Sequence, residues 1–439
     1  MLQTIRLWFA PAPAIPKKSE KEIQTLYPKF RFRVLESTFL GYTTYYLTRN
    51  NFSPVSKEIG EALSYSKTEI GDILAVTAIT YGIGKFLMGA LSDRSNPKKF
   101  MAVGLFLTAI LNFSFGFANH YWIHLFLWGA NGLVQGMGWP PCGRSLGHWY
   151  SVGERGTTFA FWNIAHNIGG GIVGVIASHS AAQFGWQYAF FVPGVIALVG
   201  SGYLYIRLVD TPQSEGLPPI EVYRNDYPPE EKEDHEKELT TKQLIVEQVL
   251  TNQYIWLFAI INFFVYIIRY SLIDWGPTYL KETKGADLLG GGYSTLILEF
   301  GGIGSTILMG WVSDRFDGRR GMVSLLCIIP IFFAFLGILL NPPGSIWIDY
   351  ILFGLIGLFI YPPVMLLGVA GMDFTSKKAV GTAAGFIGLF GSLGRTAQGK
   401  GLAILATNYS WDVALYAILV STLIAIFLLV FSWNLRPRG

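Results

Sequence analysis

The sequence predicts an all-α membrane protein whose twelve transmembrane helices form two pseudo-symmetric six-helix bundles. Three observations predict this class. Hydrophobic residues make up 51% of the 439-residue chain and charged residues only 14%, whereas soluble proteins carry about 25% charged residues. Apolar runs of about 20 residues, the length that crosses a bilayer, recur along the chain. The two halves of the chain also repeat the same short motifs.

Apolar runs between clusters of charged residues define the expected spans. In the first half they cover residues 34–56, 70–91, 100–118, 121–142, 157–183 and 188–207. In the second half they cover residues 253–280, 291–313, 321–341, 346–370, 380–406 and 411–433. We therefore expect one bundle at 34–207 and a second at 253–433, with an N-terminal cytoplasmic segment at 1–33, a solvated linker at 208–252 and a cytoplasmic tail at 434–439.

The positions of lysine and arginine predict the orientation in the lipid bilayer. Most of the 33 basic residues lie in the two termini, in the linker or in loops on the same side as these segments. Because basic residues concentrate on the cytoplasmic side, both termini of this multi-pass chain are expected in the cytoplasm. The net charge of +4 then reflects cytoplasmic loops, and no nucleic acid is expected as a partner. The two cysteines lie in apolar runs, which excludes a disulfide scaffold.

Three landmarks repeat between the halves at nearly the same spacing. They are Gly89-Ala-Leu-Ser-Asp93-Arg94 with Gly310-Trp-Val-Ser-Asp314-Arg315, Trp139-Pro-Pro with Tyr361-Pro-Pro, and Arg49 with Arg269. Parallel repeats related by an axis along the membrane normal share a site near the midplane of the bilayer. The first helix of each half is therefore expected to face that site.

Arg49 and Arg269 are the candidate ligands of an anion. A guanidinium at membrane depth costs several kcal/mol unless an anion, a carboxylate or water lies beside it. Neither arginine has a carboxylate one helical turn away in the sequence. Two such groups suit a phosphate dianion, because each guanidinium donates two parallel hydrogen bonds. The alternative is a salt bridge across helices with Asp274 or Glu299.

His166 lies in the fifth span, just before the glycines that begin at Gly169. A histidine that titrates near neutral pH can help to bind a phosphate ester in either of its charge states. The alternative is a hydrogen-bonded core residue. The glycine run from Gly169 to Gly174 matches GxGxxG but lies inside an apolar span, so it predicts close approach of helices rather than a dinucleotide site.

Other polar side chains extend the candidate site. Tyr42 and Tyr46 precede Arg49 on the same helical face, and Tyr266 precedes Arg269 by three residues. These rings either contact the ligand or pack in the core. Lys85, deep in the second span, either steers the substrate or forms an ion pair. Arg395 in the eleventh span either meets the part of the substrate remote from its phosphate or pairs with Glu299.

The repeated loop motifs differ in kind from the residues at mid-membrane depth. Asp93 and Arg94 follow the second span, and Asp314 and Arg315 follow the eighth. At the cytoplasmic ends of helices, such pairs can link helices in one conformation and release them in the other. We expect them to be gate elements.

These motifs resemble the organophosphate:phosphate antiporters of the major facilitator superfamily, over residues 30 to 430. The resemblance is carried by Gly41-Tyr42 through Arg49, Asp93-Arg-Ser-Asn-Pro97, Gln135 to Arg144, Glu154-Arg-Gly156, Asn163 to Gly171, Asp210-Thr-Pro-Gln-Ser, Gly216-Leu-Pro-Pro-Ile220, Arg269-Tyr270, Asp274-Trp275 and Gly381-Thr-Ala-Ala-Gly385. It implies a bacterial inner-membrane exchanger in which Arg49 and Arg269 bind phosphate and His166 lies in the site. It also implies that Tyr42, Tyr46, Lys85, Trp139 and Tyr266 line the cavity.

One departure from the family pattern concerns charge. Relatives commonly carry Arg-Lys in the first helix, where this chain has Arg49-Asn50. The interior lysine that would balance Asp274 and Glu299 is therefore missing.

The predicted function is exchange of a sugar phosphate for inorganic phosphate by alternating access, without an enzymatic activity, a cofactor or a metal, and by a monomer. Charge in the eleventh span, at Arg395, resembles the hexose-phosphate branch of the family, which implies a hexose 6-phosphate such as glucose 6-phosphate. The extra hydroxyls of a sugar could use this extra donor. The linker motifs resemble the glycerol-phosphate branch of the family, which implies the alternative substrate, glycerol 3-phosphate. An alternative of another class is a sugar-phosphate sensor that acts through a partner kinase.

Overall fold

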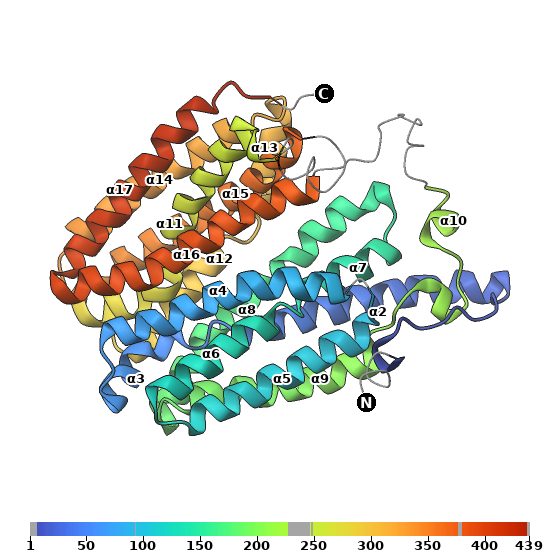
Figure 1. The fold of residues 1–439 in the computed structure, drawn as a ribbon, viewed down its shortest axis with the longest axis horizontal. Coiled ribbons are helices and arrows are strands. Elements are labelled where there is room, and N and C mark those ends of the chain that lie inside the picture. The colour runs from blue at the N-terminus through green and yellow to red at the C-terminus, as the bar shows by residue number, and fades with distance from the viewer. Residues whose placement is uncertain (1–6, 93, 227–245, 247–248, 376–379, 437–439) are drawn as a thin grey trace.

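The computed structural model describes residues 7–92, 94–226, 246, 249–375 and 380–436, which form helices, turns and loops without a strand. Figure 1 shows two helical bundles side by side, the N-terminal half in blue to green and the C-terminal half in yellow to red. The predicted all-α class is confirmed.

The N-terminal half consists of long helices and two short ones. They are α2 (Glu20–Leu47), η1 (Ser53–Val55), α3 (Ser56–Leu63), α4 (Lys67–Ser92), α5 (Pro97–Phe117), α6 (Tyr121–Gln135), α7 (Trp139–Trp149), α8 (Val152–Phe184) and α9 (Tyr188–Arg207). Local capping defines several of their ends: the Asn96 side chain accepts from the Lys99 amide before α5, and Ser151 and Glu154 form a capping box at α8.

The C-terminal half repeats this plan. Its helices are α11 (Gln253–Thr283), α12 (Leu288–Gly301), α13 (Ser305–Arg315), α14 (Arg320–Leu340), α15 (Ile346–Asp373), α16 (Val380–Asn408) and α17 (Trp411–Phe431). Among the described residues of the two halves, eight helices are long and apolar enough to cross a membrane. Each of the twelve predicted spans contains at least one helix, consistent with a multi-pass membrane fold.

Two predicted spans are broken at glycines. The fourth span contains two helices: α6 ends at Gln135, and α7 begins at Trp139, after Gly136 and Gly138. The eighth span divides into α12 and α13 around Gly304, whose φ of 83° favours glycine. Hydropathy does not register such breaks, because glycine interrupts a helix without adding polarity.

The first predicted span is displaced along the chain. Helix α2 begins at Glu20 within the expected polar segment, and it ends at Leu47 although the apolar run continues. Arg49 therefore lies in the turn after α2, with its amide bonded to the Tyr46 carbonyl. The prediction that Arg49 is part of the first helix is wrong by two residues, although Arg49 still lies beside Tyr46.

Helices of the two halves pack closely at one end of the molecule. A Cβ added to Gly71 of α4 would lie 2.7 Å from the carbonyl oxygen of Gly399 in α16, and one added to Gly174 of α8 would lie 2.5 Å from that of Gly292 in α12. A Cβ on Gly169 would likewise meet the Thr43 carbonyl. The prediction that the glycines from Gly169 to Gly174 allow close helix approach is confirmed, within the N-terminal half at Gly169 and between the halves at Gly174.

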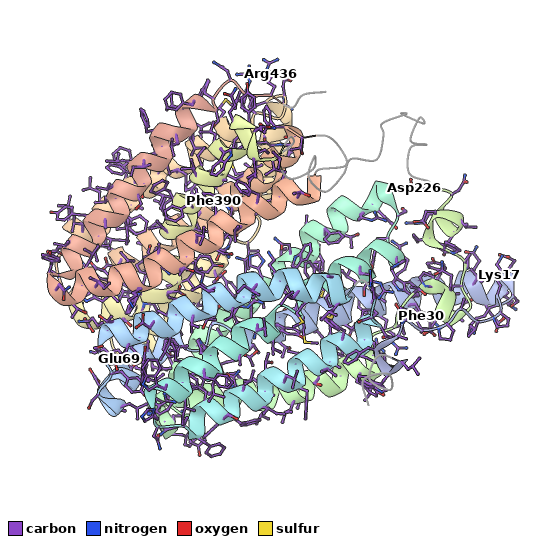
Figure 2. The ribbon with its side chains drawn as sticks, in the orientation of Figure 1. Lys17, Phe30, Glu69, Asp226, Phe390 and Arg436 are labelled. Atoms are coloured by element: carbon purple, nitrogen blue, oxygen red, sulfur yellow. The ribbon has the colours of Figure 1, made fainter. Side chains whose placement is uncertain are left out.

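The same end carries polar links between the halves. Lys281 of α11 lies 2.6 Å from the Glu58 carboxylate of α3, and Lys67 lies 2.9 Å from Glu282. Figure 1 shows the bundles diverging toward the opposite end, where Figure 2 places Lys17 and Arg436. Figure 2 shows Glu69 at the closed end and Asp226 at the end where the bundles diverge. The structure is thus closed at one end of the halves' interface.

The start of the predicted linker is folded onto the N-terminal half. It contains η2 (Pro212–Glu215) and α10 (Ile220–Arg224), and the Asp210 carboxylate accepts from the Ala12 amide at 2.8 Å. Hydrogen bonds from Ser151 and from the Gly153 amide hold the pKa of Asp226 below its usual value. Residues 208–226 of the predicted linker are therefore folded and in contact with other segments. Its acidic run, residues 227–245, lies outside the described residues.

Candidate functional site

Arg49 is buried between α4 and α6, with 6% of its surface exposed. Its Nε donates to Gln135 Oε1 at 3.0 Å, and Nη1 donates to the Tyr81 hydroxyl at 3.2 Å. Its guanidinium carbon lies 4.3 Å from the ring centroids of both Tyr46 and Tyr81. Nη2 has no hydrogen-bond partner among the described residues. The side chain is thus fixed by neutral groups and retains a donor for a ligand.

Arg269 occupies the middle of α11 and is 7% exposed. Its guanidinium carbon lies 4.5 Å from the centroid of the Tyr361 ring and 5.1 Å from that of Tyr270. Its Nε has no hydrogen-bond partner among the described residues. Within that part of the chain, no carboxylate lies at salt-bridge distance from Arg49 or Arg269. Aromatic faces stabilise the cations without neutralising them.

A row of three rings connects the two arginines. Tyr46, under Arg49, has its centroid 5.7 Å from the His166 ring, which lies 5.6 Å from Tyr361, under Arg269. His166 Nδ1 hydrogen-bonds the Asn163 carbonyl, and since a carbonyl only accepts, Nδ1 carries a proton. The structure thus brings four predicted site residues together, two arginines, Tyr46 and His166, with one cation contributed by each half.

The two carboxylates considered as partners of the arginines are engaged elsewhere. Glu299 Oε2 accepts from Asn167 Nδ2 at 3.0 Å and from the Tyr361 hydroxyl. Asp274 accepts from Gln398 Nε2 at 2.7 Å and pairs with Arg395. The alternative of a direct salt bridge to Arg49 or Arg269 is therefore not formed in this structure.

Arg395 of α16 pairs with Asp274 of α11. Its Nη2 lies 3.2 Å from Oδ1 and its Nε 3.4 Å from Oδ2, and the pair is buried. Its guanidinium carbon also lies 4.1 Å from the Tyr270 centroid, on the ring shared with Arg269. The predicted pairing of Arg395 with Glu299 is wrong for this structure. Arg395 is instead the counter-ion of Asp274, a role expected of the lysine that relatives carry at the position of Asn50.

Comparisons with known proteins now identify the family. The profile described as Major Facilitator Superfamily matches residues 38–399. The chain belongs to this superfamily. It is 43% identical to the glycerol-3-phosphate transporter of Bacillus subtilis (strain 168), over 98% of each chain. It is 37% identical to the probable hexose phosphate transport protein of Chlamydia trachomatis serovar D, over 99% of each chain.

Two further comparisons bear on class and fold. The chain is 36% identical to the membrane sensor protein UhpC of Escherichia coli (strain K12), over 92% of each chain. An inward-facing, unoccupied bacterial homolog of the human lysosomal transporter Spinster matches with a TM-score of 0.70 and 15% identity, over 92% of this chain and 95% of that one. The resemblance to organophosphate:phosphate antiporters and the twelve-helix major facilitator fold are confirmed, and the chain is not an enzyme.

Of the other predicted cavity residues of this major facilitator protein, two tyrosines pack near the rings beside the arginines, and Lys85 and Trp139 do not. Tyr42 is buried, and its ring centroid lies 5.4 Å from that of Tyr46. The ring centroids of Tyr266 and Tyr270 lie 5.5 Å apart. Lys85 is exposed one turn along α4 from Tyr81 and has no hydrogen bond to a described residue. Trp139 begins α7 and is 41% exposed. In the part of the chain that the structure describes, neither side chain forms a hydrogen bond or ring contact with Arg49, Arg269 or the tyrosine rings beside them.

The predicted gate residues are only partly described. Asp93 and the Asp314 side chain lie outside the described residues. Arg94 is exposed, and Arg315 lies 5.6 Å from the Trp311 ring. The gate therefore stays a prediction.

Four residues of the site were missed from the sequence. Tyr81 and Gln135 hold Arg49, and Tyr361 holds Arg269. Tyr270, the fourth, lies against both Arg269 and Arg395. Each of the first three had a signal: Tyr81 lies one helical turn before Lys85, Gln135 begins a motif that carries the family resemblance, and Tyr361 begins one of the repeated Pro-Pro motifs. Helical spacing alone does not show which of several aromatic residues faces the site.

Proposed function

We propose that the chain transports organophosphates by exchanging a phosphate ester for inorganic phosphate across the bacterial inner membrane. The observation that supports this most is the pair of buried arginines, one from each half, each with an unpartnered nitrogen among the described residues. The relatives named as glycerol-3-phosphate and hexose phosphate transport proteins support the same substrate class.

The arrangement supports exchange over net flux. A phosphate dianion accepts hydrogen bonds from Arg49 and Arg269 at once and thereby joins the halves. Without it, two positive charges stay at mid-membrane depth with neutral partners, which is costly to occlude. A ligand that binds the occluded conformation more tightly lowers this barrier, so the occupied carrier changes conformation more readily than the empty one.

The remaining predicted residues have supporting roles in this proposal. His166 faces the anion with Nε2, which accepts from a monoanion when neutral and donates to a dianion when protonated. Tyr42, Tyr46 and Tyr266 line the cavity, and Lys85 and Trp139 lie on the route to it. The route opens toward the cytoplasm if the termini are cytoplasmic, since the bundles diverge there (Figure 1).

The predicted organisation completes the proposal. The bundles span 34–207 and 253–433, and Asp93, Arg94, Asp314 and Arg315 gate the cytoplasmic ends of the helices. The carrier acts as a monomer, because one chain supplies both arginines of the site.

The choice of phosphate ester depends on Arg395. A hexose 6-phosphate was predicted because this side chain could donate to sugar hydroxyls, but its guanidinium is held by Asp274. This pairing favours glycerol 3-phosphate, as does the glycerol-3-phosphate transporter at 43% identity. Hexose 6-phosphate is the second candidate, because Arg395 shares the Tyr270 ring with Arg269 and so lies beside the site.

Transport by reconstituted vesicles preloaded with inorganic phosphate tests the proposal. We expect uptake of labelled glycerol 3-phosphate that depends on internal phosphate, with slower uptake of labelled glucose 6-phosphate. Faster uptake of the glucose ester would select the hexose branch. Binding of either ester without any uptake would contradict antiport and favour a sensor, the class of the UhpC relative.

A further inference from the structure

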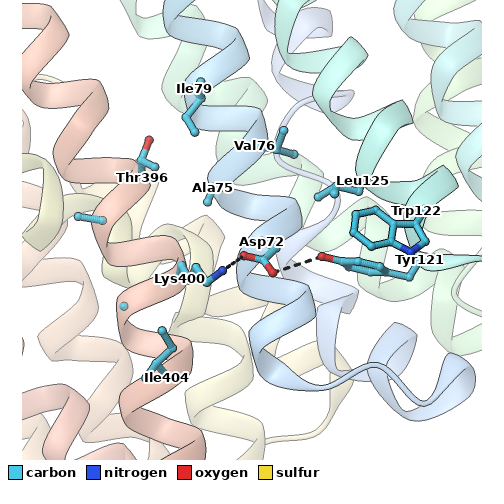
Figure 3. Close-up of a pocket in the computed structure, with 12 residues that line it drawn as sticks. Asp72, Ala75, Val76, Ile79, Tyr121, Trp122, Leu125, Thr396, Lys400 and Ile404 are labelled. Atoms are coloured by element: carbon cyan, nitrogen blue, oxygen red, sulfur yellow. Dashed lines mark hydrogen bonds and ion pairs between the residues drawn. The ribbon is translucent and has the colours of Figure 1, made fainter.

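A groove lies between the halves, outside the arginine site. It has a volume of about 640 Å³ and is formed by α4, α6 and α16 (Figure 3). The side chains that matter here are Asp72, Val76, Ile79, Trp122, Lys400 and Ile404. Because α4 and α6 belong to one half and α16 to the other, the groove exists where the halves meet.

The polar part of the groove is one ion pair with room for a ligand. Lys400 Nζ lies 2.8 Å from Asp72 Oδ1, and the Tyr121 hydroxyl donates to Asp72 Oδ2 at 3.2 Å. The Lys400 side chain is 50% exposed and that of Asp72 27% exposed. An ammonium has three donors and a carboxylate about four acceptor positions, so both groups retain capacity for a further charged partner.

The apolar part of the groove extends from this pair toward mid-membrane. Asp72 lies little more than one turn from the start of α4, whereas Val76 and Ile79 lie one and two turns deeper. On α16, Lys400 lies about one turn nearer the helix end at Asn408 than Thr396, and Ile404 lies one turn nearer that end again. The groove therefore presents charges at the level of a lipid headgroup and apolar side chains at the level of an acyl chain.

The groove is open to its surroundings. Trp122 is 67% exposed and Ile79 is 47% exposed, although both are large apolar side chains. In a bilayer such surfaces face hydrocarbon, and a tryptophan at the start of a span marks the interface between lipid and water. Figure 3 shows Trp122 and Tyr121 on α6 at the level of Asp72.

We propose that this groove binds a phospholipid whose headgroup carries a primary ammonium. The lipid phosphate contacts Lys400, its ammonium contacts Asp72, and one acyl chain lies against Val76 and Ile79. A zwitterionic headgroup matches a site with one cation and one anion. A quaternary choline cannot donate a hydrogen bond to a carboxylate, and an anionic lipid without an ammonium leaves Asp72 unmatched. Since both halves form the groove, the lipid favours the conformation that is closed at this end.

Lipid binding to the full-length purified protein tests this proposal. Native mass spectrometry gives the apparent Kd for phosphatidylethanolamine, phosphatidylcholine and phosphatidylglycerol at matched chain length. We expect Lys400→Gln to weaken phosphatidylethanolamine binding about tenfold, the effect of losing one charged hydrogen bond. We expect wild-type protein to prefer phosphatidylethanolamine to the other two lipids.

A second variant fills the groove without touching the ion pair. A Cβ added at Gly401 meets nothing within 4 Å, so Gly401→Leu occupies the groove without a backbone clash. Gly202→Leu on α9, which also has open space, is the matched control. Weaker binding in Gly401→Leu and wild-type binding in Gly202→Leu support the site. Wild-type binding in Gly401→Leu, or equal affinity for phosphatidylcholine, would overturn it.

Discussion

Arg395 and Asp274 form a buried ion pair that links α16 to α11 beside Arg269. The pair shares the Tyr270 ring with Arg269 and accepts a further hydrogen bond from Gln398 at Asp274. Because Asp274 pairs with Arg395, its carboxylate is not available to Arg269. The pair therefore keeps the phosphate-facing arginine without a carboxylate partner.

Removing one member of this pair should destabilise the protein. Asp274→Asn leaves the Arg395 guanidinium buried without a counter-ion, at a cost of about 3 kcal/mol. Asp274→Asn combined with Arg395→Gln should recover much of that loss. Thermal unfolding of the purified single and double variants measures the coupling. Purely additive losses would show that the two side chains do not stabilise each other.

Tyr361→Phe should weaken phosphate binding while it keeps the ring under Arg269. The change removes the hydroxyl that bonds Glu299, so this carboxylate is freed to pair with Arg269 and compete with phosphate. We expect the Kd for inorganic phosphate, measured by calorimetry, to rise about fivefold, the worth of one hydrogen bond. Tyr409→Phe, at a 72% exposed position, is the control. An unchanged Kd in Tyr361→Phe would mean that Glu299 does not compete.

Glu58→Gln should favour opening at the closed end. The Glu58 carboxylate is 2.6 Å from Lys281, and the side chains are 24% and 2% exposed, so the change leaves a buried ammonium without its counter-ion. We expect the loss to be about 2 kcal/mol, or about a thirtyfold shift in population. Alkylation of a cysteine introduced by Thr278→Cys, a buried position facing Ser56, reports this opening.

Glu61→Gln provides the matched control for that measurement. Glu61 pairs with Lys57 within α3, at 3.6 Å, and its side chain is 67% exposed. Its loss should leave the alkylation rate unchanged. If both variants accelerate labelling equally, the link between the halves through Lys281 has no specific role.

Gly174→Val should block closure between α8 and α12. The added Cβ would lie 2.5 Å from the Gly292 carbonyl oxygen. Because this oxygen belongs to the backbone of α12, the clash is relieved only if α8 and α12 move apart. Vesicles should contain the inserted variant but show little exchange. Gly202→Val, where a Cβ meets nothing within 4 Å, should exchange normally. Normal exchange by Gly174→Val would contradict the need for this close contact.

The sequence predicted the elements whose signal is local. Hydropathy located a helix in every span, and the repeated positions of Arg49 and Arg269 pointed to a shared site. It did not predict that α2 ends before Arg49 or that Gly304 divides a span, because neither changes the apolar pattern. Hydropathy also does not predict which carboxylate on another helix pairs with a given cation.

The partner choice of Arg395 illustrates that limit. Its spacing in the eleventh span was compatible with Glu299, a partner on another helix, or with the substrate. Only the packing of α16 against α11 brings Asp274 within 3.2 Å of its Nη2. Tyr361 was visible as a repeated motif, but its contact with Arg269 depends on how α15 faces α11.

The central claim, that one arginine from each half holds the same phosphate, is tested most directly by phosphate self-exchange in reconstituted vesicles. Arg49→Lys and Arg269→Lys keep the charge but remove the paired donors of the guanidinium. The account predicts that each change lowers the initial exchange rate by about a hundredfold or more, at unchanged insertion, as expected for losing charged hydrogen bonds. Exchange at the wild-type rate by either variant would contradict it.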